Sequence, residues 1–221
     1  MVILCWAAKG GSGATVVAAA LALTSGRSTL LVDLDGELPA ALGIPEPDRP
    51  GIDDWLASDA PASHLSDLQI ALDPHVDLLP FAQLRTDGRR APKPARRDER
   101  WMELSGWLAE RQRDGLDVVV DAGTGEPNAV LAAAVDCRLL VTRPCYLALR
   151  RASRAATTPT GVVVVDEPGH ALSTRHVERA VGAPVVAVID FDPAIARAVD
   201  SGLLATRLPR VVGRELRRVA A

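Results

Sequence analysis

The stretch "ILCWAAKGGSGATVVAAALAL", Ile3 to Leu23, decides how the rest of the sequence is interpreted. An apolar run of strand length leads into a glycine-rich turn, and an Ala- and Val-rich segment with helical spacing follows. Gly10, Gly11 and Gly13 let the backbone turn with its N–H groups pointing inward, and the N-terminus of the following helix adds positive partial charge. The stretch therefore predicts an anion-binding loop between a strand and a helix, of the kind that cradles phosphate.

Position 14 departs from the usual phosphate-loop pattern G-x-x-x-x-G-K-[S/T]. In that pattern the lysine contacts the β- and γ-phosphates and the following Ser or Thr holds Mg²⁺. This chain has Ala14 in place of the lysine, keeps Thr15, and carries another lysine at Lys9. Because phosphoryl transfer relies on positioning and charge stabilisation, the missing lysine predicts slow or absent hydrolysis, while the glycine loop can still bind a nucleotide.

Apolar runs of strand length recur along the chain and alternate with Ala- and Leu-rich helical stretches. The runs are continuous rather than alternating, which is typical of strands covered on both faces, and strand–helix alternation favours a parallel sheet. We therefore predict a single doubly wound α/β domain over residues 1–221, with a mainly parallel sheet and helices on both faces. The expected strands are Val2–Ala7, Thr29–Val32, Val76–Leu79, Val118–Val120, Leu139–Val141, Val162–Val165 and Val185–Ile189, and the expected helices include Thr15–Thr24, Trp101–Arg113 and Asn128–Val135.

Composition narrows the class of protein. A formal net charge of −3 argues against a globally basic nucleic-acid binder, so any basic partner surface must be local. Cys5, Cys137 and Cys145 each lie in an apolar run without metal-ligand spacing, which is typical of core residues in a reducing compartment. The chain shows no signal-peptide pattern and no apolar run of membrane-spanning length, so we expect a cytoplasmic protein.

Three acidic residues stand at the ends of predicted strands. Taken singly, Asp33, Asp35 and Asp121 could simply end their strands, and Thr15 could be an ordinary first residue of a helix. Placed together around one glycine loop, they favour a metal–phosphate site.

The loop Lys9–Val16, "KGGSGATV", resembles the loop of the ParA/MinD family of deviant Walker-A ATPases, which are P-loop proteins of the SIMIBI class. In that family the first lysine reaches across a dimer interface to the partner's nucleotide. The resemblance implies this role for Lys9, with ATP and Mg²⁺ as cofactors and a degenerate loop that lacks the second lysine. It also implies nucleotide contacts by the whole loop, namely Lys9, Gly10, Gly11, Ser12, Gly13, Ala14, Thr15 and Val16.

Two further motifs follow in the order of the family. "STLLVDLDGELPAALGI", Ser28–Ile44, resembles the second motif, which implies that Asp33 supports the metal shell and that Asp35 orients the attacking water. "DVVVDAGTG", Asp117–Gly125, resembles the Walker-B strand and implies that Asp121 lies near Mg²⁺. The implied metal residues are thus Thr15, Asp33 and Asp121, and the implied catalytic residues are Asp35 and Lys9.

The base-binding part of the resemblance lies near the carboxyl end. "VVAVIDFDPAIARAVDSG", Val185–Gly202, resembles the segment that closes the adenine pocket, which gives Asp190 a place in the cofactor site. Where family members often carry an Asn that reads adenine, this chain has Asp166 followed by Glu167. Asp166 is therefore a second candidate at the base, and adenine and guanine both stay open.

The resemblance implies a nucleotide-dependent homodimer that positions an assembly and has weak or no ATPase activity. Within the family the altered loop is most similar to the TadZ/CpaE-like branch, which marks sites for pilus or secretion machinery. A protein partner in such a system, and recruitment to the inner face of the membrane or a cell pole, would follow. The alternatives are an active ParA-like partition ATPase that binds DNA and a nucleotide-free structural dimer.

Two basic segments remain outside these motifs. Gln83–Arg100 is expected to be an exposed basic loop, and a solvated connection is favoured over a nucleic-acid patch because no aromatic residues interleave. Residues 207–221 are expected to form a basic C-terminal helix. It resembles the membrane tail of MinD, but few of its residues could enter a bilayer, so a helix packed on the domain is favoured and membrane contact is at most peripheral.

Overall fold

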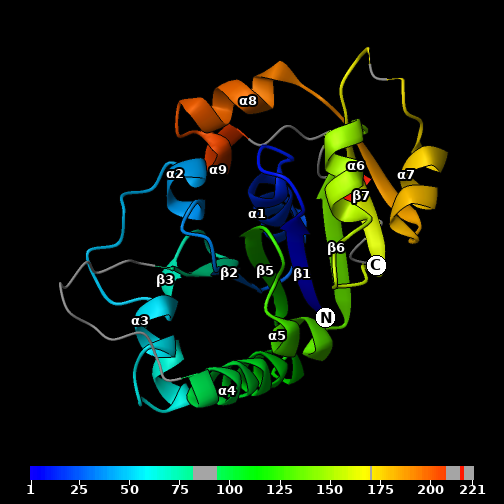
Figure 1. Cartoon of the computed structure of the whole chain (residues 1–221). Coiled ribbons are helices and arrows are strands. Elements are labelled where there is room, and N and C mark those ends of the chain that lie inside the picture. Colours follow the sequence, from blue (N-terminus) through cyan, green and yellow to red (C-terminus); the bar gives the residue numbers. More distant parts are fainter. Residues whose placement is uncertain (82–93, 170, 208–214, 217–221) are drawn as a thin grey trace.

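The chain folds around one eight-stranded sheet with helices on both faces (Figure 1). The structure, a computed structural model, describes residues 1–81, 94–169, 171–207 and 215–216, and the side chains of all these except 94–97 and 207. The strand order is β3-β4-β2-β5-β1-β6-β7-β8, and all neighbours pair in parallel except β3 and β4. This confirms the predicted doubly wound α/β class. The strands are β1 Val2–Ala7, β2 Thr29–Asp33, β3 Ile70–Ala71, β4 Val76–Leu79, β5 Asp117–Thr124, β6 Cys137–Thr142, β7 Gly161–Asp166 and β8 Val185–Asp190.

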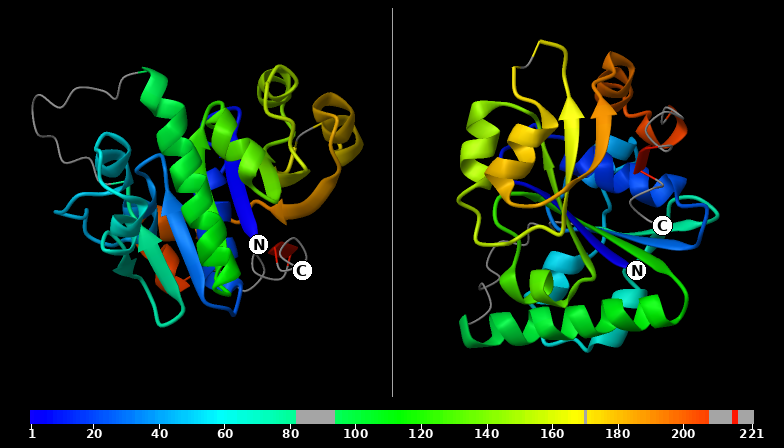
Figure 2. Two further views of the ribbon diagram at one scale, coloured as in Figure 1. Left: turned by 90° about the horizontal axis from the view of Figure 1, so that it is seen from below. Right: turned by 90° about the vertical axis from the view of Figure 1, so that its right-hand side faces the viewer.

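The helices form two layers, seen from two directions in Figure 2. One layer includes α1 (Ala14–Thr24), α2 (Leu38–Leu42), α8 (Pro193–Asp200) and α9 (Leu204–Arg207). The other includes α3 (Ile52–Leu56), the 3₁₀ turn η1 (Ala62–Ser66), α4 (Pro94–Arg113), α5 (Ala129–Ala134), α6 (Tyr146–Ala152) and α7 (Thr174–Val181). Alternate residues of the central strands enter the two cores, as Ile3 and Leu4 of β1 do, which explains their continuous apolar character.

Helix α1 lies close against the sheet because its inner face is built from alanine. Ala18, Ala19 and Ala20 are completely buried in the same core as Cys5 of β1. Small side chains allow the helix axis to approach the strands, and this fixes the loop between β1 and α1 at the carboxyl end of the sheet. Trp6 is also fully buried, on the opposite face of β1.

The prediction of an exposed loop over Gln83–Arg100 is wrong for the last seven residues of that range. Helix α4 begins at Pro94 rather than at Trp101, and Arg100 is only 7% exposed. The Arg100 guanidinium lies 3.6 Å above the Trp55 ring and donates hydrogen bonds to the carbonyl oxygens of Trp55 (3.0 Å) and Ala60 (2.9 Å). Arg100 therefore fixes α4 to α3 and to the following loop, while residues 83–93 lie outside the described residues.

The predicted C-terminal basic helix, 207–221, falls mostly outside the described residues, which include only 207, 215 and 216 of its range. Leu216 is completely buried in the core beside α1. At this residue the chain therefore packs on the domain. Among the described residues, no helix is long and apolar enough to cross a membrane.

Candidate nucleotide-binding site

The glycine loop between β1 and α1 has the geometry of an anion nest. Gly11 and Gly13 adopt φ angles of 74° and 96°, which an L side chain rarely takes, and Gly13 is the N-cap of α1 without a side-chain hydrogen bond. Ser12 is buried, and its hydroxyl donates to the Lys9 carbonyl at 2.7 Å, which ties the loop together. The first N–H groups of α1 are thus left without a side-chain cap and can meet an anion.

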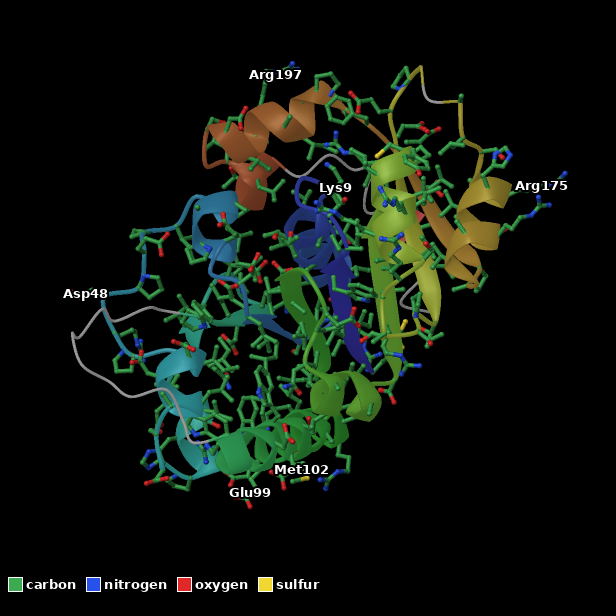
Figure 3. The ribbon with its side chains drawn as sticks, in the orientation of Figure 1. Lys9, Asp48, Glu99, Met102, Arg175 and Arg197 are labelled. Carbon is green, nitrogen blue, oxygen red and sulfur yellow. The ribbon has the colours of Figure 1, made fainter. Side chains whose placement is uncertain are left out.

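The two positions that set the loop apart from the usual pattern lie in different environments. Ala14 is 6% exposed and joins the core with its methyl group, so the chain itself supplies no cation there. Lys9 is half-buried on the loop, where Figure 3 labels it, and its Nζ donates to the Gly10 carbonyl at 3.3 Å. Within one copy of the chain, Lys9 is therefore engaged with its own loop.

The strand order brings the predicted acids to this loop. β5 lies between β2 and β1, so Asp33 at the end of β2 and Cys5 of β1 both pair in register with Asp121 of β5. Parallel strands end at the same edge of a sheet, which is where ligands of doubly wound folds bind.

Asp33 is completely buried and fully hydrogen-bonded. Its Oδ1 accepts the backbone N–H groups of Asp35 (3.1 Å) and Gly36 (2.8 Å), and its Oδ2 accepts that of Leu38 (3.4 Å). Burial raises the pKa of this carboxyl from 3.8 to about 6, although the three backbone hydrogen bonds lower it. These contacts hold the turn that presents Asp35.

Asp121 has one carboxylate oxygen without a partner. Its Oδ1 accepts the Gly123 N–H at 3.0 Å, whereas its Oδ2 is buried with no hydrogen bond. Burial raises the pKa of Asp121 from 3.8 to about 7, the Thr15 hydroxyl and the Gly123 amide lower it, and the charges of Asp33 and Asp35 raise it. An unsatisfied buried oxygen costs free energy unless a ligand meets it, so this atom fits a cation in the bound state.

Asp35 lies directly against Gly123. A Cβ at position 123 would come within 2.2 Å of the Asp35 Oδ2, and Gly123 has a φ angle of 64°. Glycine is therefore required at 123 for both space and backbone conformation. The end of β5 and the turn after β2 thus meet at the Asp35 carboxylate.

Two cavities meet at the glycine loop. The loop cavity, about 460 Å³, is lined by Gly11–Val16 and by Asp35, Glu37, Gly123 and Asp200, among others. The apolar cavity, about 390 Å³, is lined by Val16, Val165, Phe191 and residues of α8, among others. They share six lining residues: Gly11, Ser12, Gly13, Val16, Val199 and Asp200. A cavity lined by a glycine loop and joined to an apolar cavity fits a phosphate chain attached to a planar base.

The predicted base residues differ in their placement. Asp190 at the end of β8 lines the apolar cavity. Asp166 is exposed and lines neither cavity, while its backbone carbonyl accepts the Phe191 N–H at 2.6 Å and so holds the loop after β8.

Several lining residues were not singled out from the sequence. Arg143 lines the apolar cavity, pairs with Glu167 at 3.2 Å and lies 5.6 Å from the Phe191 ring centroid. Glu37 and Asp200 line the loop cavity. For Glu37 the signal was available, since it follows Asp35 in the same motif, whereas Arg143 and Asp200 come from elements whose approach only the fold determines.

No cluster of three or more His, Cys, Asp or Glu side chains in the described part of the chain could hold a metal by itself. This agrees with Mg²⁺ chemistry in nucleotide sites, where one or two protein ligands act together with phosphate oxygens and water. Thr15 and the free oxygen of Asp121 provide such a partial set, so the residues present fit Mg²⁺ bound with a nucleotide.

Comparison with known proteins places the chain in a family. The sequence profile described as "Cellulose biosynthesis protein BcsQ" matches residues 1–176. The chain belongs to the BcsQ family. A search of curated protein sequences found no match.

Solved structures show the same fold as this BcsQ-family chain. The cell division ATPase MinD of Pyrococcus furiosus is 22% identical with a TM-score of 0.77, covering 99% of this chain and 98% of its own. MinD of Pyrococcus horikoshii, complexed with Mg-ADP, is 21% identical with a TM-score of 0.71, covering 99% and 93%. The Aquifex aeolicus MinC:MinD complex gives 18% identity and a TM-score of 0.72, covering 99% and 95%. The fold is that of MinD-type P-loop ATPases.

Proposed function

We propose that this protein binds ATP with Mg²⁺ in the two joined cavities, forms a nucleotide-supported homodimer and positions a cell-envelope assembly, with weak or no ATP hydrolysis. The observation that carries the proposal is the buried Oδ2 of Asp121, which forms no hydrogen bond, on a carboxylate beside the Thr15 hydroxyl; Thr15 and the glycine loop line the loop cavity. The Mg-ADP bound by a MinD of the same fold supports the choice of ligand class.

The roles of the residues follow from their contacts. The loop amides and the N-terminus of α1 would hold the phosphates, and Thr15 with Asp121 would hold Mg²⁺, which supplies charge neutralisation when bound. Asp35, held against Gly123, would orient water. Asp33 would act indirectly, because both of its oxygens are occupied by amides of the turn that carries Asp35.

The charges around the loop cavity explain why hydrolysis should be weak. Among the described residues that line it, Asp35, Glu37 and Asp200 are acidic and none is a lysine or arginine. Because Ala14 supplies no cation, a single copy has little to stabilise the negative charge of a transition state. Lys9 of the partner subunit would bring the missing positive charge, which makes nucleotide binding and dimerisation depend on each other.

The kind of assembly is proposed from the family. Its description names cellulose biosynthesis, so an exopolysaccharide machine at the inner face of the membrane or at a cell pole is the first candidate. A pilus or secretion assembly, as in the TadZ/CpaE-like branch, is the second. A protein partner is supported by the MinC:MinD complex of the same fold.

Isothermal titration with ATP in the presence and absence of Mg²⁺ tests the proposal. We expect binding by the parent that Mg²⁺ strengthens, and loss of the Mg²⁺ effect in Asp121→Asn. Asp48→Asn is the matched control and should behave as the parent, because Asp48 is exposed, lines neither cavity and lies on a different part of the molecule from Lys9 (Figure 3). A parent that binds no ATP under either condition would overturn the proposal and leave the nucleotide-free structural dimer as the candidate. Rapid turnover together with DNA binding would favour the partition ATPase.

A further inference from the structure

Two neighbouring helices on the sheet face opposite α1 carry a surface of unpaired arginines. Helices α6 and α7 contact each other, and Leu149 of α6 and Val177 of α7 pack into one core over β7. Their outer side bears Arg150 and Arg151 of α6, Arg154 just after it, and Arg175 and Arg179 of α7, all exposed. We call these five residues the arginine face.

None of the five guanidinium groups forms a hydrogen bond or ion pair with any described residue. Glu178 is the one acid within α6 and α7, and its Oε1 accepts the Val185 N–H at 3.0 Å. Nearby Glu126 accepts the N–H groups of Ala156 and Thr157, and Glu167 pairs with Arg143. The acids close to this face are therefore engaged elsewhere, and in a chain of formal net charge −3 the cluster is a strong local exception.

Helical geometry places two apolar side chains on the same side. Tyr146, the only tyrosine of the chain, is 70% exposed and Leu147 is 56% exposed. At 100° per residue, these two and Arg150 and Arg151 fall within one arc of α6, whereas Ala148, Leu149 and Ala152 face the core. The outer side of α6 thus combines an aromatic ring, a branched apolar group and two cations, and Arg154 follows in the turn after the helix.

We infer that the arginine face, with Tyr146 and Leu147, binds the anionic surface of a lipid membrane. Arginines attract acidic headgroups, and a tyrosine and a leucine suit the boundary between headgroups and acyl chains. Duplex nucleic acid would use the charges but leave the exposed leucine without a role, so the lipid surface is the better match. The inference rests on the proposed function in that it names the surface by which the protein would reach the membrane.

Co-sedimentation with vesicles tests the inference. The parent, without nucleotide, should bind vesicles that contain phosphatidylglycerol, should not bind vesicles of phosphatidylcholine alone, and should be released by salt. Arg150→Gln/Arg179→Gln should weaken binding about 30-fold, since each arginine near the surface contributes about a fivefold factor. The control Arg113→Gln/Arg197→Gln removes the same number of charges at exposed positions outside the face, and its vesicle binding should stay close to that of the parent. Figure 3 shows Arg197 on a different part of the molecule from Arg175 of the face.

A third variant separates membrane from other partners. Tyr146→Ser/Leu147→Ser should weaken vesicle binding while leaving the charges intact. Three results would each overturn the inference. They are failure of the parent to bind the vesicles, equal loss of vesicle binding in the two double arginine variants, and binding of duplex DNA by the face without binding of vesicles. Loss of an ATP-dependent dimer in the Tyr146/Leu147 variant with unchanged vesicle binding would assign the face to a second copy instead. Because nucleotide is omitted from the vesicle assay, its failure leaves ATP binding untouched.

Discussion

At the scale of single residues, position 14 sets the chemistry of the loop. Ala14 is buried at the start of α1 and is also one of the residues that line the loop cavity. A lysine at this position would bring a cation from the same chain to a cavity lined by three acids.

Ala14→Lys should raise steady-state ATP turnover about 10- to 100-fold, which corresponds to one charge-assisted hydrogen bond of about 1.5–3 kcal/mol. Adding Asp35→Ala should abolish the gain, because the residue that orients water is then absent. The assay compares the parent with both variants. A parent that already turns over as fast as Ala14→Lys would contradict the proposed weak hydrolysis.

The buried acids predict how stability changes with pH. The pKa values of Asp33 and Asp121 are raised by burial to about 6 and about 7, above the ordinary 3.8. Between pH 3.8 and these raised values, each carboxyl has lost its proton in the unfolded chain but keeps it in the folded protein. The free energy of unfolding should therefore fall as pH rises, by at most about 1.4 kcal/mol per pH unit for each group. The two neighbours should titrate as a coupled pair.

Urea unfolding of the ligand-free protein across this range measures the effect. Asp121→Asn should flatten the dependence above about pH 6, where Asp33 has lost its proton, because the amide does not titrate. Asp48→Asn should leave it as in the parent. An unfolding free energy that rises with pH in the parent, and that Asp121→Asn leaves unchanged, would contradict the raised pKa of Asp121.

Much of the site could be predicted from the sequence at this scale, because glycine spacing and strand-end acids are local signals. What could not be predicted is the difference between the acids: both oxygens of Asp33 accept backbone amides, whereas one oxygen of Asp121 stays free. That distinction depends on the neighbouring strand and turn, not on the residue type.

At the scale of elements, α2 and the segment after α8 meet through two glycines. A Cβ on Gly43, the C-cap of α2, would lie 1.6 Å from the Gly202 carbonyl oxygen, and both residues have positive φ angles. Side chains of α2 and α8 also line the loop cavity, Ala40 and Ala41 from one and Val199 and Asp200 from the other. This contact therefore joins two walls of the site.

Gly43→Ala should destabilise the protein and weaken ATP binding, since it adds both backbone strain and a collision. Gly182→Ala is the matched control: Gly182 has nearly the same φ (76° against 75°), also caps a helix, and has open space around its Cβ position. Thermal unfolding should show the control losing about 1 kcal/mol and Gly43→Ala clearly more. Equal losses of unfolding free energy in the two variants would mean that the close contact between Gly43 and Gly202 does not affect stability.

The position of α4 shows why an element boundary was missed. Basic residues followed by a tryptophan predicted a loop and then a helix, because arginine is normally solvated. In the structure Arg100 is buried by stacking on Trp55 and by two carbonyl acceptors that come from 40 or more positions earlier. A sequence pattern does not reveal such a partner.

At the scale of the whole molecule, the proposed function calls for a second copy of the chain. In one copy Lys9 bonds to its own loop, and the described lining of the loop cavity is acidic. The fold class itself could be predicted because each central strand is apolar on both sides, but nothing in the sequence pattern determines a quaternary state.

Light scattering on the parent and on Lys9→Ala, each with and without ATP–Mg²⁺, tests the dimer. We expect the parent to dimerise only with nucleotide and Lys9→Ala to remain monomeric, because a desolvated contact with phosphate contributes about 1.5–3 kcal/mol or more. As a surface residue of a monomer, Lys9 would contribute at most about 0.5 kcal/mol. Dimers of equal amount in all four samples would favour the structural dimer.

The strand order also determines when the site can form during synthesis. β1 is made before the other strands of the sheet, yet its two neighbours, β5 and β6, begin at Asp117 and Cys137. Until β5 has been made, the strand that leads into the glycine loop has no partner, and closing such distant pairs is slow. The loop, Asp33 and Asp121 therefore reach their final positions in one late step, when β5 inserts between β2 and β1.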